Sequence, residues 1–247
     1  MMSLRNSLLC CLSLIMLVGG FALRAAGRPA DGPSLKVKST SDFEVTGDGS
    51  NPAWEKTGWT PLHKRSSQGH SYEARFKVLY SKKGIYFLMD GTDSKLTASF
   101  TQDFEDLWTE DVYEVFLWTD ERYSIYFEYE ISPLNYELPI LVPNFGGEFL
   151  GWRPWHYDGE RKIRKATAVR GGPRKSGAAI QGWSAEFFIP YEVLTPLQNV
   201  PPKPGTRWRA NFYRVDHDGE KRTAWMWSRV EGRFHEYEQF GTLEFEE

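Results

Sequence analysis

Cysteine is nearly absent from this 247-residue chain, because its two cysteines, Cys10 and Cys11, both lie within the first 26 positions. That segment has Arg5 near its start, an apolar run over residues 8–21 and small residues ending at Ala26, which is the order of a secretory signal peptide. We expect residues 1–26 to be removed and the protein to be secreted or periplasmic. The mature chain would then lack cysteine, which excludes disulfides, a thiolate nucleophile and cysteine-ligated metals.

Long apolar runs and an excess of positive charge are also missing. The run over residues 8–21 is shorter than the roughly 20 residues of a membrane helix, so we expect no membrane span after cleavage, with an uncleaved anchor as the alternative. Once Arg5 and Arg24 are removed, 28 of the 30 Lys and Arg residues remain against 33 Asp and Glu residues. This interspersed, net negative charge argues against nucleic acid and against an anionic membrane surface as partners.

Short catalytic and nucleotide-binding motifs are absent as well. The five histidines never stand at the HxH or HxxxH spacing of a local zinc site. The sequence has no GxSxG elbow, GxGxxG turn or P-loop. A functional site must therefore combine residues that are far apart in the sequence.

What the chain does have is aromatic residues, with 10 Trp, 12 Tyr and 16 Phe, and a period-two alternation of apolar and polar residues along several segments. Such alternation places one set of side chains on each face of a β-strand. Clusters of Gly, Pro and Asp separate the segments, as they do in β-sandwiches. We expect an all-β, jelly-roll-like β-sandwich with few helical turns, monomeric, in which a linker over residues 27–41 precedes one domain over residues 42–247. The expected strands cover residues 72–80, 85–89, 111–118, 123–131, 183–189 and 208–212.

Clustered acids suggest two kinds of chemistry. Asp90 and Asp93 offer oxygen ligands to a hard cation, so a structural calcium ion is a candidate cofactor, although turn acids also serve as caps. A glycosidase would need two carboxyl groups about 5–10 Å apart across its substrate, which acids on adjacent strands could supply. Glycan hydrolysis therefore stays open as an alternative function.

Tryptophan beside acids also suits sugar binding. The C–H face of a pyranose packs on an aromatic ring, while carboxylates, amides and Arg bond the hydroxyl groups at its edge. Trp183 and Trp208 alternate with apolar residues and are expected in the core. Trp108 stands in a polar turn just before a strand, where a rigid support can expose a binding residue.

Several stretches, taken in order, resemble carbohydrate-binding module family 9, a group of DOMON-like β-sandwich domains, over roughly residues 42–246. The best single signals are the block LWTEDVYEVFLW and the terminal strand FGTLEF. The other stretches are PAWEKTGW, GIYFLMDGTDS, YFEYEISPLN, GWSAEFFIPYEVL, RWRANFYRVD and AWMWS followed by FHEYEQ.

The resemblance implies a protein that binds glucan- or xylan-type sugars between two aromatic residues and is linked to polysaccharide catabolism. The aromatic positions fall at Phe104 or Trp108 and at Phe234, where a binding member of the family has Trp. The hydrogen-bonding candidates are Glu110, Glu128, Arg214 and His235. We expect no catalytic residue.

The resemblance also leaves a second alternative open, because related sandwiches hold haem between an axial methionine and a histidine. Met89, Met226, His217 and His235 are the residues that could do so here, although nothing in their spacing favours it.

Overall fold

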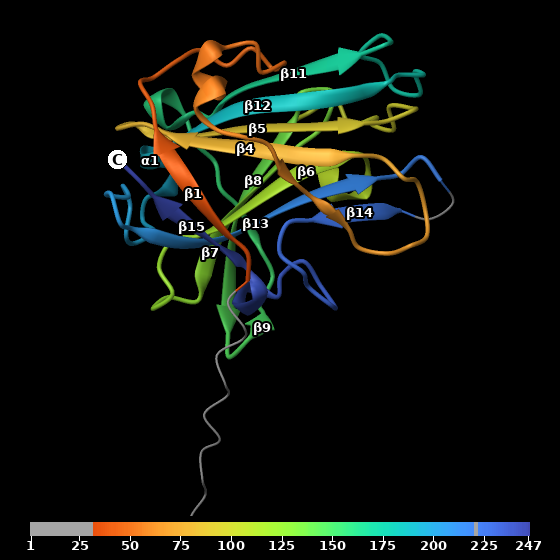
Figure 1. The fold of residues 1–247 in the computed structure, drawn as a ribbon. Helices are drawn as coiled ribbons and strands as arrows, with labels where there is room; N and C mark the ends of the chain where they lie inside the picture. The colour runs from red at the N-terminus through yellow and green to blue at the C-terminus, as the bar shows by residue number, and fades with distance from the viewer. Residues whose placement is uncertain (1–31, 220–221) are drawn as a thin grey trace, which may run out of the picture.

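The computed structural model describes residues 32–219 and 222–247. The signal peptide predicted over residues 1–26 lies outside these residues. Two layers of strands face each other, with β11, β12, β5 and β4 in one layer and β8, β6, β13 and β15 in the other (Figure 1). In the described part of the chain, no helix has both the length and the apolar character needed to cross a membrane.

Fifteen strands and a few short helical turns make up the described chain. The strands are β1 (Ser34–Ser39), β2 (Thr60–Pro61), β3 (His63–Lys64), β4 (Ala74–Tyr80), β5 (Gly84–Thr92), β6 (Val112–Trp118), β7 (Ile125–Ile131), β8 (Glu137–Phe145), β9 (Glu148–Phe149), β10 (Arg153–Pro154), β11 (Arg164–Arg170), β12 (Gly182–Pro190), β13 (Arg207–Asp216), β14 (Thr223–Met226) and β15 (Gly241–Phe245). The turns are η1 (Pro52–Lys56), η2 (Leu107–Thr109), η3 (Gly159–Arg161), α1 (Tyr191–Leu194) and η4 (Tyr237–Gln239).

Sheet A has the strand order β10-β8-β7-β6-β13-β15, and sheet B has the order β4-β5-β12-β11. Strand β14 pairs with β13 and with β3 beside sheet A, while β2 pairs with β4 in sheet B. Strand β1 runs parallel to β15 through residues 34–37 and parallel to β4 through residues 38–39, so it joins the two sheets. The predicted all-β sandwich is confirmed.

Strand β1 differs from the linker expected over residues 27–41. Its sequence SLKVKS alternates, and Val37 is fully buried in the core between the sheets while Lys36 is exposed. The composition suggested a linker because lysine and serine fill the outward positions. The inward apolar positions, Leu35 and Val37, are what hold the segment in the sandwich.

The core between the sheets is aromatic. The ring centroids of Phe76 on β4 and Phe212 on β13 lie 4.0 Å apart, and those of Phe87 on β5 and Phe212 lie 5.9 Å apart. Alternation directs these residues inward and sends their sequence neighbours to the outer face of each sheet. Those outer faces carry the polar clusters described next.

Candidate functional site

Three glutamates gather on the outer face of sheet A. Strands β6 and β7 pair so that Glu114 lies opposite Glu130 and Phe116 opposite Glu128. The alternate residues Val115 and Phe127 belong to the core between the sheets, so the glutamates must point the other way. All three side chains are nevertheless buried. We call Glu114, Glu128 and Glu130 the carboxyl cluster.

Burial of this cluster comes from two segments that cross the outer face of sheet A. Leu107 of η2 packs there with Phe116, and Phe234, Tyr237 and Phe240 pack there from the segment between β14 and β15. These residues form a second apolar cluster, separate from the core between the sheets. The carboxyl cluster therefore lies under a lid of loop residues and has little contact with solvent.

Burial raises the pKa of every carboxyl in the cluster. The pKa of Glu114 rises to about 8, because desolvation outweighs the favourable charge of Arg222. The pKa values of Glu128 and Glu130 rise well above the usual range, because desolvation is reinforced by the other carboxyls. Burial and mutual repulsion thus favour the protonated form of these carboxyls. A protonated carboxyl both donates and accepts, as a sugar hydroxyl does.

His235 closes one side of the cluster. Its Nδ1 lies 2.5 Å from the Tyr126 hydroxyl and 3.6 Å from Glu128 Oε2. Burial, helped by Arg233, lowers the pKa of His235 to about 4, so the imidazole is neutral at pH 7 and forms no ion pair with Glu128. Phe149 stacks on the imidazole with centroids 4.1 Å apart, which fixes the ring.

Phe234 forms the neighbouring wall and is nearly buried. Its ring stacks on Tyr213 with centroids 4.0 Å apart, and the Tyr213 hydroxyl donates to the Phe234 carbonyl. The guanidinium carbon of Arg222 lies 5.3 Å from the centroid of Phe234. Because Tyr213 covers one face of Phe234, a ligand can reach only the rest of this ring.

Trp108 is half-buried and belongs to η2. Its backbone amide donates to the Glu130 carboxylate, and its backbone contact with His217 favours the charged imidazole. Burial and the charge of Arg222 outweigh that contact, so the pKa of His217 is lowered. The Trp108 side chain is thus carried by a backbone that the cluster itself holds in place.

The structure therefore brings together Trp108, Glu128, Phe234 and His235, four of the predicted binding residues. Glu110 lies beside this group at the end of η2, where its carboxylate accepts from the backbone amides of Ser99, at 2.5 Å, and Phe100, at 3.3 Å. These bonds give Glu110 the role of anchoring the segment at residues 99–100.

Arg214 lies outside the group, whereas Phe104 packs against the apolar cluster on the outer face of sheet A that also holds Phe234. Phe104 stacks on His156 with centroids 4.2 Å apart, and its amide donates to the Glu137 carbonyl at the start of β8. Arg214 is fully buried on the inner face of β13, because it alternates with Tyr213 and Val215, which face the carboxyl cluster side.

The residues that the sequence interpretation missed are Glu114, Glu130 and Arg222. Alternation in the segment VYEVFLW did place Glu114 beside Phe116, but that neighbour suggested only a structural role. A second signal was available in YFEYE at residues 126–130, because Glu128 and Glu130 are two residues apart on a strand and must share one face. No local pattern links Arg222 to this sheet face.

Arg214 is surrounded by acids at one end of the sandwich. Its Nη2 lies 3.0 Å from Asp93 Oδ2 and 3.1 Å from Asp216 Oδ2, all within fully buried side chains. Carboxylate oxygens of Asp93, Asp111 and Asp218 also lie within 4.8 Å of one another. One guanidinium thus faces four acids.

The acids of this group fit a hard cation. Burial raises the pKa of Asp93 to about 7 despite Arg214, and burial followed by repulsion from Asp93 raises that of Asp111 to about 8. A divalent cation would offset this excess negative charge through oxygen ligands, which calcium prefers. Asp93, Asp111 and Asp218 are the residues that would hold it.

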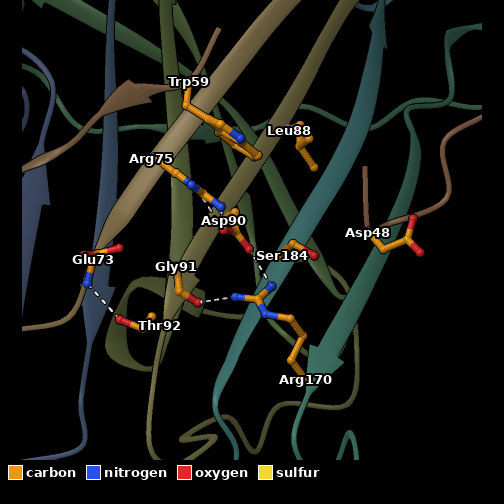
Figure 2. Close-up of a pocket in the computed structure, with 10 residues that line it drawn as sticks. All are labelled: Asp48, Trp59, Glu73, Arg75, Leu88, Asp90, Gly91, Thr92, Arg170 and Ser184. Carbon is orange, nitrogen blue, oxygen red and sulfur yellow. Dashed lines mark hydrogen bonds and ion pairs between the residues drawn. The ribbon is translucent and has the colours of Figure 1, made fainter. Parts of the chain in front are cut away.

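Asp90 does not join these acids, although it was predicted to share a metal with Asp93. It lies on the outer face of sheet B between the guanidiniums of Arg75 and Arg170, which repel a cation (Figure 2). The two acids are three positions apart, and an odd spacing along a strand end directs side chains to opposite faces.

The methionines expected for a haem site do not fit one. Met89 is buried in the core between the sheets, whereas Met226 belongs to the cluster on the outer face of sheet A. The Met226 sulfur already accepts the Val230 amide at 3.4 Å. Met226 lines a cavity of about 440 Å³, but neither His217 nor His235 is among the residues that line it.

The sequence profile of carbohydrate-binding family 9 matches residues 54–245, a range that includes both sheets and the carboxyl cluster. This chain belongs to carbohydrate-binding family 9. The family segment begins at Trp54 and ends at Phe245, so β1 precedes the matched region. No curated protein is significantly similar to the chain in sequence.

Solved structures share the family 9 fold. A protein from Bacteroides uniformis superposes with a TM-score of 0.71 at 18% identity, covering 87% of this chain and 100% of that one. A family 9 carbohydrate-binding module from Caldicellulosiruptor kristjanssonii, solved with cellotriose and with glucose, has a TM-score of 0.61 at 16% identity. It covers 86% of this chain, and 93% and 95% of the module in the two complexes is covered.

Proposed function

We propose that this protein is an exported, non-catalytic carbohydrate-binding protein that recognises glucan- or xylan-type sugars at the carboxyl cluster and serves polysaccharide breakdown. One observation carries the proposal. The backbone of Trp108, the side chain of His235 and three buried carboxyls with raised pKa values, which come from separate parts of the sequence, meet on one face of sheet A.

The chemistry of that face suits a polyhydroxylated ligand. Glu128 Oε2 and Glu130 Oε2 have no hydrogen-bond partner among the described residues, although both atoms are buried. An unpartnered buried oxygen costs about 1–3 kcal/mol, which a sugar hydroxyl would recover by bonding to it. Trp108, whose backbone contacts Glu130, would supply the aromatic ring, and the neutral imidazole of His235 would supply a further bonding group.

Calorimetric titration with cellotriose and xylotriose tests this proposal. Trp108→Ala removes the ring without removing the backbone bonds of residue 108, so affinity should fall about tenfold or more while the fold is kept. Trp155→Ala is the matched control, because Trp155 is also half-buried but its indole N–H donates to the carbonyl of Val193 in α1. Unchanged affinity in the Trp108 variant would remove this residue from the site.

The raised pKa values of the cluster support glycan hydrolysis as the second candidate, because a general acid needs such a shift. Release of reducing sugar from xylan or glucan by the purified protein would establish it, and loss of that release in Glu114→Gln would place the acid in this cluster. Glu110→Gln is the companion variant, since Glu110 bonds backbone amides and should affect loop order more than chemistry. Absence of product at high protein concentration favours binding alone.

We also propose that Asp93, Asp111 and Asp218 hold a structural calcium ion. Calcium should raise the melting temperature, and a chelator should lower it, because the ion would neutralise acids that burial keeps close together. Asp218→Asn should weaken this response, whereas Asp120→Asn, which alters a separate ion pair with Arg122, should leave it intact. A melting temperature insensitive to both calcium and chelator would contradict the proposal.

A further inference from the structure

The outer face of sheet B carries a second polar site. A cavity of about 320 Å³ opens there, and we call it the Trp59 pocket. Its volume lies within the range of small-molecule sites. It is lined by Asp48, Trp59, Glu73, Arg75, Leu88, Asp90, Gly91, Thr92, Arg170 and Ser184.

Sheet register builds the floor of the Trp59 pocket. Arg75, Asp90, Ser184 and Ala168 form one cross-strand row over β4, β5, β12 and β11. Asp90 stands at the centre of the row with Arg75 on one side and Ser184 on the other (Figure 2). Because the row ends in two small residues, no bulky side chain fills the space above it.

The polar groups of this floor are held in place without a ligand. Asp90 Oδ2 accepts from Arg75 Nε at 3.1 Å, and Oδ1 accepts from Arg170 Nη1 at 2.5 Å. Arg170 also donates through Nη2 to the Gly91 carbonyl at 2.9 Å. Fixed side chains lose little freedom when a ligand binds, which favours affinity.

Trp59 supplies an aromatic wall, and 37% of its surface is exposed. The guanidinium carbon of Arg75 lies 4.3 Å from its ring centroid and the ammonium nitrogen of Lys77 lies 5.0 Å from it, so two cations hold the indole in place. Large exposed aromatic residues are few among the described residues. Trp59 lies beside the guanidinium of Arg75 and the carboxylate of Asp90, which are planar groups that can bond hydroxyls (Figure 2).

The charges of the pocket select a neutral ligand. Three carboxylates, Asp48, Glu73 and Asp90, line it against two guanidiniums, so an anion gains no net attraction. Hydroxyl groups can donate to the carboxylate and accept from the guanidiniums at once. An indole wall next to such a floor matches the apolar face and hydroxyl edge of a pyranose.

We propose that the Trp59 pocket is a second sugar site, which binds one neutral pyranose residue on the sheet opposite the carboxyl cluster. That the pyranose belongs to a glucan or a xylan rests on the proposed function. The inference that the pocket binds a pyranose rests on the pocket's own residues. Two sites on opposite faces of one domain would let a single chain contact two polysaccharide strands, or two stretches of one strand.

Titration of the full chain with cellotriose and xylotriose, followed by the indole N–H resonances in ¹⁵N-labelled protein, tests this inference. The Trp59 resonance should shift and saturate, and it should still do so in Trp108→Ala. Trp59→Ala should weaken binding at this site about tenfold or more, and Trp59→Tyr, which keeps a ring, should weaken it less. Tyr123→Ala is the matched control, because Tyr123 is another exposed aromatic beside an Arg–Asp pair.

The outcomes separate the two proposals. A Trp59 resonance that stays fixed while the wild-type protein saturates overturns the second site and leaves the proposed function standing. A response of Trp59 that disappears in Trp108→Ala also overturns it, because the two sites would then not be independent. A response of Trp59 alone, unchanged in Trp108→Ala, supports this pocket and overturns the carboxyl cluster as the sugar site. Absence of any shift in the wild type overturns both.

Discussion

Glu186 and Glu128 are the same residue type, each buried on the outer face of one sheet, yet their surroundings are opposite. Glu186 on sheet B accepts the Trp54 indole N–H at 2.8 Å and the amides of Thr46 and Gly47 at 2.8 and 2.9 Å. Glu128 on sheet A has one oxygen without any partner among the described residues.

This difference separates an acid that stabilises the fold from an acid whose buried oxygen lacks a partner among the described residues. The bonds of Glu186 fix the segment at residues 46–54 against sheet B, so they stabilise the folded chain. Glu128, Glu130 and Glu114 instead add an unfavourable burial that the charge of Arg222 and the backbone of Trp108 offset only in part. Buried ionisable groups whose desolvation is not offset by partners are typical of binding and catalytic sites.

The largest effect should follow from removing Glu186, the buried acid that has hydrogen-bond partners, and it should appear in the free energy of unfolding. Glu186→Ala leaves an indole N–H and two amides buried without an acceptor, so the free energy of unfolding should fall by about 3 kcal/mol or more. Urea unfolding measures it. The control is Glu128→Gln, which should cost less than about 1 kcal/mol at pH 7, because it replaces a protonated carboxyl by a group of similar shape. Equal losses in the two variants would contradict the comparison.

The next effect is a dependence of stability on pH. The pKa of Glu114 is about 8 in the folded chain, against an ordinary value of 4.5, so folding strengthens its hold on a proton. Its contribution to stability is therefore present below about pH 4.5 and is lost as the pH rises through 8. The melting temperature should fall between pH 6 and pH 9, and Glu114→Gln, measured in the same chelator-containing buffers, should reduce the fall. A profile that rises over this range would contradict the assignment.

The smallest effect should appear in sugar affinity at a single substituted acid. Glu128→Gln keeps a hydrogen-bonding group of similar shape but replaces one carboxyl oxygen by an amide nitrogen, which cannot accept a hydrogen bond. Affinity for cellotriose should therefore fall about threefold to tenfold, or 0.6–1.4 kcal/mol. The matched substitution Glu186→Gln should leave affinity unchanged in whatever fraction remains folded. Calorimetry on both variants measures the difference.

Much of the fold was predictable, because each long strand carries its own alternation. The strands expected over residues 111–118, 123–131 and 183–189 correspond to β6, β7 and β12 within a few residues. Strand β8 was not predicted, since its sequence ELPILVPNF contains two prolines and is buried on both faces, so it does not alternate. Strand β1 was missed because lysine and serine, which are common in linkers, make up most of its sequence SLKVKS.

The candidate site was predicted in part. Trp108 and His235 were found because each belongs to a recognisable stretch near a strand end. Arg214 was predicted as a binding residue but lies on the inner face of sheet A, since sequence position near a motif does not say which face of a strand a side chain occupies. The Trp59 pocket was not predicted at all, because its floor is made by register across four strands.

By itself, the sequence determined that this protein is all-β and which residues alternate to each face of its strands, because side-chain direction follows from a backbone period of two. It also contained the family 9 pattern. Tertiary structure alone decided which buried acids have partners, because donors such as the Trp54 indole come from segments more than 100 residues away. Among the six carboxylates of residues 102–118, Glu110 thus anchors a loop, Asp111 joins the acid group fit for a cation and Glu114 belongs to the carboxyl cluster.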